Sequence, residues 1–357
     1  MFCDWHNLHD IGCSNIGYTT LYVMVIIMHI GLIDVDGHNF PNLCLMKLSA
    51  YHKLQGDSVD WYSTSVKMYD IVYMSKVFSD TYSKPRSIPL NAKQVIKCGS
   101  GYAIRTEHGI EVYDKSKDLS LPYEVEHMYS DYSLYPEHTG YGRLLKDQTA
   151  YGFLTRGCPR GCNFCHVGAK EGCKSVKVAD LTEFWKGQGN ICLSDPNILA
   201  CKDAIMLLQQ LQESGAVIDF NQGIDARLIT EAKAELLASM KLKAPHFAMD
   251  SMKCMESVKR GLSLYVDAYK RIKGSWNYRN ASVFMLTNFD TTHEEDMIRI
   301  KAIQDCECRP YVMIYNKPSA PAITRRLQRW VNNRILYAKT QDFLEYQRHE
   351  YKTVLEE

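Results

Sequence analysis

The chain has 357 residues, 46% of them apolar and 23% charged, which is typical of a globular protein with room for two domains. The formal net charge of +1 excludes a strong overall field that would attract nucleic acid. Thirteen cysteines in so long a chain do not match the regular pairs of a short secreted disulfide protein. We therefore expect a cytoplasmic protein in which most cysteines are core residues and a few bind metal.

Residues 1–29 are interpreted as an N-terminal extension. The stretch 16–33 carries no acidic or basic side chain except a histidine and is close to the minimum length of a membrane helix. It lacks the early positive charge and the cleavage site of a signal peptide. Because it continues into an expected buried strand, a soluble appendage is favoured over a membrane anchor. A third alternative is a natural start at Met28, with residues 1–27 outside the natural protein.

Residues 30–123 are predicted to form a small Rossmann-like α/β domain. An amphipathic segment, 42–54, is expected to be a helix that ends at Gly56. Strands that alternate with helices or crossovers indicate a parallel sheet. The four strands are expected at 30–35, 58–62, 71–74 and 95–98.

Residues 124–150 are rich in Tyr, Pro, Asp and His without a period, and are predicted to be a surface linker. From residue 151 a second alternation predicts a partial (β/α)6 TIM-like barrel over 151–318, followed by a helical segment over 319–357. Parallel barrels carry their chemistry at the C-terminal ends of the strands. The expected strands are 152–155, 190–193, 217–220, 246–249, 282–286 and 311–315, with helical patterns at 207–212 and 231–240.

Three cysteines lie within eight residues directly after the first barrel strand. Cys158, Cys162 and Cys165 have the spacing C-x3-C-x2-C, and Gly157 and Gly161 allow the loop to curl tightly. Three thiolates can each bind one iron of a 4Fe–4S cluster and leave the fourth iron open. A zinc site is less favoured because structural zinc takes four ligands, usually in paired C-x2-C halves. Chance crowding in a cysteine-rich chain is a third reading.

This segment resembles the signature of the radical S-adenosylmethionine superfamily, C-x3-C-x-aromatic-C, with Phe164 at the aromatic position. The resemblance covers residues 151–315. It implies that S-adenosylmethionine binds the open iron through its amino and carboxylate groups, and that Phe164 packs near the nucleoside. It also implies a flavodoxin- or ferredoxin-type electron donor and cleavage to a 5′-deoxyadenosyl radical.

The resemblance assigns further roles at the other strand ends. Asp195 is expected to accept a hydrogen bond from the amino group of S-adenosylmethionine. Arg227 is expected to hold the carboxylate through two hydrogen bonds, with an ordinary surface or helix-start role as the alternative. Asp250 and Ser251 are expected to contact the ribose, and the backbone at Tyr315 the adenine.

The first domain resembles the cobalamin-binding domain of one radical S-adenosylmethionine subgroup. Its motif D-x-H-x-x-G is matched by Asp36 and His38, with Pro41 where glycine is usual. Later family elements resemble Ser75-Lys76-Val77 and Gly99-Ser100-Gly101. The resemblance implies that His38 binds cobalt and that Asp36 fixes its tautomer. Because Pro41 stiffens the turn, a domain that kept the fold and lost cobalamin is the alternative.

Residues 309–341 contain no acidic residue. Ile323, Leu327, Trp330 and Val331 share a helical face, which predicts a packing helix with a solvated basic face. The alternative is a contact with RNA phosphates. The basic side chains that would make it are Arg325, Arg326 and Arg329.

These patterns predict a radical S-adenosylmethionine enzyme, and the cobalamin-like domain favours methyl or methylthio transfer. The rival is a noncatalytic iron–sulfur protein for electron transfer or sensing. That rival would supply a fourth protein ligand to the cluster and would need no ring of strand ends around it. Small molecules, peptides and RNA all stay open as substrates.

Overall fold

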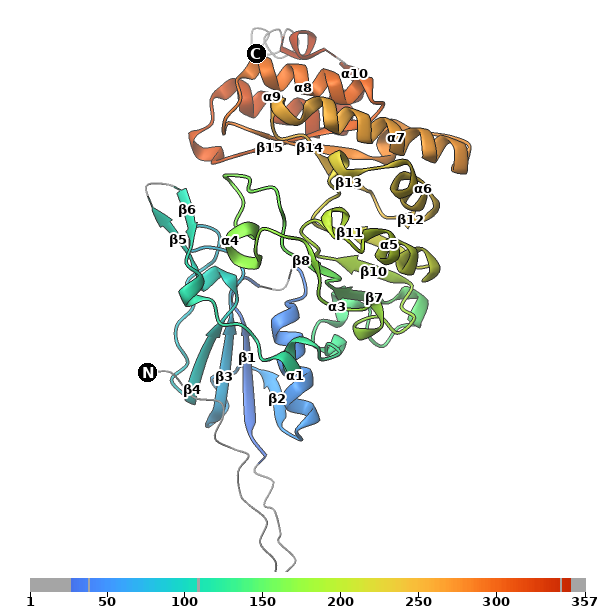
Figure 1. Cartoon of the computed structure of the whole chain (residues 1–357). Helices are drawn as coiled ribbons and strands as arrows, with labels where there is room; N and C mark the ends of the chain where they lie inside the picture. Colours follow the sequence, from blue (N-terminus) through green and yellow to red (C-terminus); the bar gives the residue numbers. More distant parts are fainter. Residues whose placement is uncertain (1–26, 38, 108–109, 341, 348–357) are drawn as a thin grey trace, which may run out of the picture.

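The computed structural model describes residues 27–37, 39–107, 110–340 and 342–347, and Figure 1 shows them as two α/β units side by side. The predicted fold class is confirmed, since both units are built on parallel sheets. Within these residues no helix is both long and apolar enough to cross a membrane. Most of the apolar stretch 16–33 lies outside the described residues, and its last part forms the first strand.

The first unit is a four-stranded parallel sheet in the order β2-β1-β3-β4. Each predicted strand is present, at β1 (His29–Asp34), β2 (Ser58–Trp61), β3 (Tyr69–Ser75) and β4 (Ala92–Cys98). The order reverses direction between β1 and β3, and such a point leaves a crevice at the carboxyl ends of the strands. Residues 34–36, 75–76 and 98–101 lie along that edge.

The first helix, α1 (Leu43–Leu54), is confirmed with boundaries set by two local signals. The side chain of Asn42 accepts a hydrogen bond from Leu45 N at 3.3 Å and caps the N-terminus. Gly56 follows the last turn with φ +87°, a conformation that side chains disfavour.

A hairpin that the sequence analysis missed extends from the first unit towards α4 (Val167–Glu171) in the second (Figure 1). It consists of β5 (Ile104–Glu107) and β6 (Ile110–Tyr113), paired antiparallel. The following segment contains the short helices α2 (Tyr123–Glu126) and α3 (Pro136–Thr139).

The segment predicted as a surface linker is in fact packed between the two units. Tyr135 is fully buried and donates to Asp34 Oδ2, at the end of β1, at 2.8 Å. Tyr132 is 5% exposed and donates to the carbonyl of Phe184 in the second unit at 2.8 Å. Tyrosine can bury a ring and still hydrogen-bond at its tip, so this tyrosine-rich segment joins the units.

The second unit contains all six predicted barrel strands, arranged as two adjoining parallel sheets. One sheet has the order β12-β11-β10-β7 and the other β13-β14-β15, and a bridge between Ile224 and Phe247 connects them. Among the described residues β7 and β15 are not paired, so the strands form an open arc. The strands are β7 (Thr149–Gly152), β10 (Asn190–Leu193), β11 (Val217–Phe220), β12 (Lys241–Leu242), β13 (His246–Ala248), β14 (Ser282–Thr287) and β15 (Arg309–Ile314).

The first barrel strand lies three residues earlier than predicted. It ends at Gly152, where a Cβ would lie 2.5 Å from the ring of Phe184. The chain then leaves the sheet, and β8 (Thr155–Arg156) pairs antiparallel with β9 (Val176–Lys177). The apolar pattern alone did not show that the chain leaves the sheet before Thr155.

Helices from the connections between the strands of the second unit lie on the outer side of its two sheets (Figure 1). Gly261 lies on the helix Met255–Lys273, close to the backbone of Ala226. A Cβ at this position would lie 1.8 Å from the carbonyl oxygen of Ala226, so only glycine permits the helix to pack this closely. The two helical patterns predicted between strands are confirmed. The helices are α5 (Ala204–Glu213), α6 (Glu231–Ser239), α7 (Met255–Lys273) and α8 (His293–Asp305).

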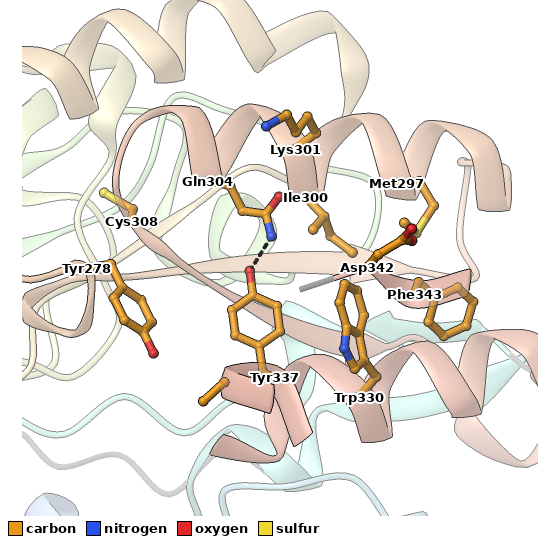
Figure 2. A pocket seen from close by; sticks show the side chains of 11 residues that line it. Tyr278, Met297, Ile300, Lys301, Gln304, Cys308, Trp330, Tyr337, Asp342 and Phe343 are labelled. Atoms are coloured by element: carbon orange, nitrogen blue, oxygen red, sulfur yellow. Dashed lines mark hydrogen bonds between the residues drawn. The ribbon is translucent and has the colours of Figure 1, made fainter. Parts of the chain in front are cut away.

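The basic C-terminal segment forms α9 (Ala322–Asn332) and α10 (Arg334–Lys339). The predicted apolar face is confirmed for Leu327, Trp330 and Val331, which are buried, and is wrong for Ile323, which is 36% exposed. A hollow of about 520 Å³ lies between α8 and α10, and Figure 2 shows the Gln304 amide donating to the Tyr337 hydroxyl across it at 2.8 Å.

A buried ion pair joins the ends of two barrel strands. Arg299 on α8 is fully buried and pairs with Asp296 one turn earlier. Its guanidinium also donates to the carbonyls of Met249, after β13, and Leu286, in β14, at 2.8 and 2.9 Å. These contacts fix the edge of the arc where Asp250 emerges.

We expect Asp296→Ala to lower the free energy of unfolding by about 3–5 kcal/mol, because Arg299 would keep a buried charge without its counterion. Asp305→Ala on the same helix is the matched control, since its pair with Lys301 is exposed and worth less than about 1 kcal/mol. Urea unfolding followed by tryptophan fluorescence measures both. Equal losses in the two variants would contradict the role given to Arg299.

Candidate functional site

The three cysteines of the motif lie on one loop between β8 and α4. Cys158 and Cys162 are half-buried and Cys165 is exposed. Two backbone hydrogen bonds shape the loop, from Cys158 N to the carbonyl of Gly172 at 3.1 Å and from Cys165 N to that of Cys162 at 2.9 Å. The loop therefore curls, as the spacing predicted.

The thiols lie within electrostatic reach of one another. Burial raises the pKa of Cys162, and the neighbouring Cys165 and Cys158 raise it further, while the guanidinium of Arg227 opposes them. Partial desolvation by the surrounding chain also raises the pKa of Cys165, a backbone hydrogen bond from Val167 lowers it, and Cys158 adds to the rise. A bound cation would lower the pKa of these thiols instead, because it stabilises the thiolate form.

The donor set fits a cluster with one open iron. Three thiols on a short loop match the ligands that such a cluster needs. In the described part of the chain no three His, Cys, Asp or Glu side chains converge closely enough to hold one metal ion. Binding of a cluster would therefore have to bring the three thiols closer together than they lie in this structure.

A buried carboxylate that the sequence analysis did not single out organises the floor of the site. Asp225 Oδ2 accepts from Arg160 Nε, on the cysteine loop, at 2.6 Å and from Asn197 Nδ2 at 3.0 Å. Burial would raise the pKa of Asp225, but hydrogen bonds from Arg227 and its charge hold that pKa below the usual range. Asp225 therefore stays ionised and ties the cysteine loop to the end of β11.

Asn197 is the second residue that was missed. It follows β10, is 4% exposed, and its Nδ2 lies 3.5 Å from Cys158 Sγ. Its Oδ1 is buried without a hydrogen-bond partner among the described residues. Buried acceptors are usually satisfied, so this oxygen fits a site that receives a donor from a bound group.

Arg227 lies at the expected strand end but is already engaged. Its Nε and one terminal nitrogen donate to Asp225 Oδ1 and Oδ2 at 2.7 and 3.1 Å. The fork that was expected to hold a ligand carboxylate thus holds a protein carboxylate in this structure. The proposed contact with S-adenosylmethionine stays a prediction and depends on rearrangement of this pair.

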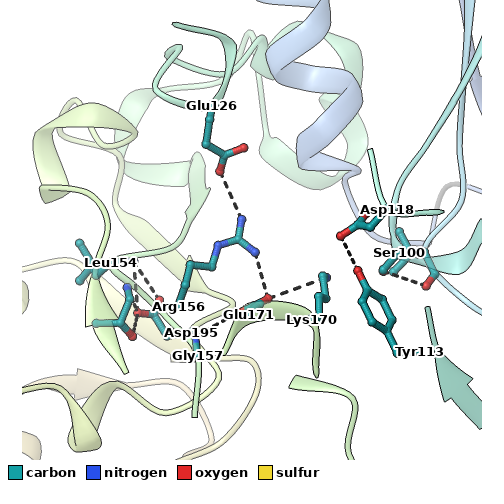
Figure 3. A network of polar contacts seen from close by, with 12 residues as sticks. Ser100, Tyr113, Asp118, Glu126, Leu154, Arg156, Gly157, Lys170, Glu171 and Asp195 are labelled. Atoms are coloured by element: carbon teal, nitrogen blue, oxygen red, sulfur yellow. Dashed lines mark hydrogen bonds and ion pairs between the residues drawn. The ribbon is translucent and has the colours of Figure 1, made fainter. Parts of the chain in front are cut away.

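Asp195 also has protein partners. Its carboxylate accepts from the backbone of Leu154 at 3.1 Å and from Thr155 Oγ1 at 2.7 Å, and it is 3% exposed (Figure 3). Burial raises the pKa of Asp195 to about 6, against these hydrogen bonds, which lower it. In this structure Asp195 holds the start of the cysteine loop, and its expected contact with an amino group stays a prediction.

Two polar links join the cysteine loop to the segment between the units and to the first unit. Figure 3 shows Arg156 between Glu171, at 3.1 Å, and Glu126, at 3.3 Å. Glu171 also accepts from Gly157 N at 3.1 Å. On the other side His166, next to Cys165, lies 3.2 Å from Glu111 of the β5–β6 hairpin.

The predicted aromatic residues are brought together through a third ring. Phe289, just after β14, lies 5.5 Å from Phe164 and 4.8 Å from Tyr315, measured between ring centroids, with both pairs edge to face. Asn288 before it has φ +61°, which turns the chain at the strand end. Phe289 was missed because no spacing linked it to the motif.

Asp250 and Ser251 follow β13 as predicted. Burial raises the pKa of Asp250, whose Oδ1 accepts from Leu286 N at 3.0 Å. The carbonyl of Ser251 accepts from the Cys254 thiol at 3.1 Å. Asp250 lies within electrostatic reach of Cys162 and Cys165, and Ser251 follows it at the same strand end.

The candidate cobalamin residues line the carboxyl edge of the first sheet. Asp36 accepts from the amides of Val77 and Phe78 and from the Ser83 hydroxyl. Ser75 is fully buried and exchanges hydrogen bonds with Asn42. His38 lies outside the described residues.

The two glycines at this edge allow the backbone of the segment after β3 to lie directly against them. A Cβ on Gly99 would lie 2.3 Å from the carbonyl of Lys76, and one on Gly101 2.3 Å from that of Phe78. Entry of a macrocycle at this edge would therefore require the segment after β3 to move.

The fold matches a solved enzyme structure. The cobalamin- and [4Fe-4S]-bound structure of TsrM, a radical S-adenosylmethionine methyltransferase from Kitasatospora setae, aligns with 81% of this chain and 72% of its own at TM-score 0.54 and 11% identity. This chain therefore shares the fold of the TsrM structure. A second TsrM structure, with tryptophan substrate and the analogue aza-SAM, aligns with 80% and 72% at TM-score 0.55 and 12% identity. No protein-family model matches the chain, and a sequence search of curated proteins finds no relative.

We expect Gly157→Ala to lower the free energy of unfolding by more than about 2 kcal/mol, because φ is +85° and the new Cβ would lie 2.2 Å from the carbonyl of Lys174. Gly161→Ala is the control: its φ is +57° but no atom lies within 4 Å, so about 1 kcal/mol is expected. Chemical unfolding of both variants measures the difference. Similar values would show that the close approach to Lys174 does not constrain the loop.

Proposed function

We propose that the chain is a radical S-adenosylmethionine enzyme that cleaves S-adenosylmethionine with one electron at a 4Fe–4S cluster. The observation that carries this proposal is the position of Cys158, Cys162 and Cys165, on one curled loop that follows β8, just beyond the first strand of an open parallel arc. In such arcs the strand ends surround the chemistry. One TsrM structure contains a [4Fe-4S] cluster, and the other contains an analogue of S-adenosylmethionine.

The proposed roles of the protein residues follow from their contacts. The three cysteines would hold the cluster, whose chemistry when bound is one-electron reduction of the sulfonium. Asp195 holds the loop start, and Asp225 ties the loop to β11. The unpaired oxygen of Asn197 is available for a donor such as an ammonium group.

Methyl transfer is the proposed outcome, with methylthio transfer as the alternative. It is supported by the parallel first unit with its switch point at β1 and β3, and by the likeness to a methyltransferase that binds cobalamin. Cobalamin would be held at the edge formed by Asp36, Ser75, Gly99 and Gly101, once the segment after β3 that lies against the two glycines has moved. The electron donor is proposed to be a flavodoxin- or ferredoxin-type protein.

The rival function is electron transfer or sensing by a noncatalytic cluster. It requires a fourth protein ligand, whereas the motif supplies three cysteines. The ring of polar and aromatic groups at other strand ends also favours the enzyme. An RNA contact through Arg325, Arg326 and Arg329 stays a proposal, to be tested by salt-dependent binding.

We expect the reconstituted protein to contain about four irons and to release 5′-deoxyadenosine when dithionite and S-adenosylmethionine are added. Cys162→Ala should lose the charge-transfer absorbance and reduce 5′-deoxyadenosine to background. Cys173→Ala is the matched control, because Cys173 is an exposed cysteine outside the motif. Stoichiometric zinc, or a reduced cluster that does not bind S-adenosylmethionine, would favour another function.

We expect the protein to retain cobalamin, and His38→Ala to convert the electron paramagnetic resonance spectrum of bound Co(II) from base-on to base-off. His29→Ala is the control, since His29 lies at the opposite end of β1. If the wild-type protein retains no cobalamin at saturating concentration, the first unit serves another purpose.

A further inference from the structure

The amide group of Asn197 lies between a cysteine of the motif and a buried carboxylate. Its Nδ2 is 3.5 Å from Cys158 Sγ and 3.0 Å from Asp225 Oδ2. Its backbone carbonyl accepts from the Ser175 hydroxyl at 2.8 Å, so the main chain is anchored as well. Asn197 is 4% exposed, so bulk water does not compete for these contacts.

These neighbours determine which end of the amide faces the cysteine. An ionised carboxylate can only accept hydrogen bonds, and Asp225 is kept ionised by Arg227 and Arg160. If the amide were rotated by half a turn, its oxygen would face both the carboxylate and the sulfur, which are acceptors. An amide nitrogen has two hydrogens, and here one points to Asp225 and the other to Cys158.

We propose that Asn197 is a positioning residue that orients Cys158 and raises the reduction potential of the cluster bound there. This inference rests on the proposed function, because it presupposes the cluster. Hydrogen bonds to the sulfurs are among the factors that set the potential of iron–sulfur clusters. A donor stabilises the reduced form more than the oxidised form, since the reduced form carries one more negative charge.

The test is a potentiometric titration of the reconstituted full-length protein without S-adenosylmethionine. Asn197→Leu keeps a similar volume and removes the donor, so the midpoint potential should become more negative. We expect about a tenfold lower ratio of reduced to oxidised cluster at a fixed potential, which corresponds to 59 mV for one electron. Asn190→Leu is the matched control at the other end of β10, where the side chain donates to the carbonyl of Gln148 at 3.2 Å.

Asn197→Asp is a second variant that keeps the side-chain shape and replaces the donor by an acceptor, in case Asn197→Leu does not fold. It should shift the potential in the same direction. Variants that hold four irons at the wild-type potential would overturn the proposal, as would folded variants that assemble no cluster, which would show a role in assembly only. If the wild-type protein forms no cluster, the proposed function fails and this inference with it. If the wild-type protein cleaves S-adenosylmethionine and only the potential is unaffected, this inference alone fails.

Discussion

The exit of the chain from the first barrel strand depends on one buried carboxylate. Asp195, after β10, accepts from backbone and side-chain donors of Leu154 and Thr155, just beyond the end of β7. Without an acceptor these amides would be buried and unpaired, at a cost of about 1–3 kcal/mol each. The carboxylate thereby ends one strand, begins the next segment and fixes where the cysteine loop starts.

The cysteine loop is then held from three directions. Asp225 binds Arg160 of the loop, and Glu171 accepts a hydrogen bond from the backbone amide of Gly157. Glu126, in the segment between the units, binds Arg156, and Glu111 of the first unit binds His166. The links made by Arg160, Arg156 and His166 join elements far apart in sequence. The loop geometry is therefore a property of the assembled units and not of the motif alone.

The two units are joined by buried tyrosines as well as by ion pairs. Tyr135 bonds to Asp34 at the end of β1, and Tyr132 bonds to the carbonyl of Phe184. The carboxyl edge of the first sheet therefore has a fixed relation to the second unit. This arrangement suits a chemistry in which groups bound by the two units must meet.

Local patterns in the chain were enough to predict the kinds of elements and most of their positions. Alternating apolar runs and caps such as Asn42 are local signals, and they gave nearly all the parallel strands of both units within a few residues. The spacing of the cysteines likewise identified the candidate ligands, because ligands on one loop are close in sequence.

The partners of the polar groups, in contrast, are set by how the strands pack against one another. The pairing of Arg227 with Asp225, the engagement of Asp195 by Leu154 and the contact of Asn197 with Cys158 join separate strand ends. The role of Phe289 between Phe164 and Tyr315 has the same origin. A hydrogen bond depends on distances of a few tenths of an ångström, and residue type and spacing do not encode these distances across a sheet. The sequence therefore shows which chemistry the strand ends can carry, and the packing of the strands decides which residue carries it.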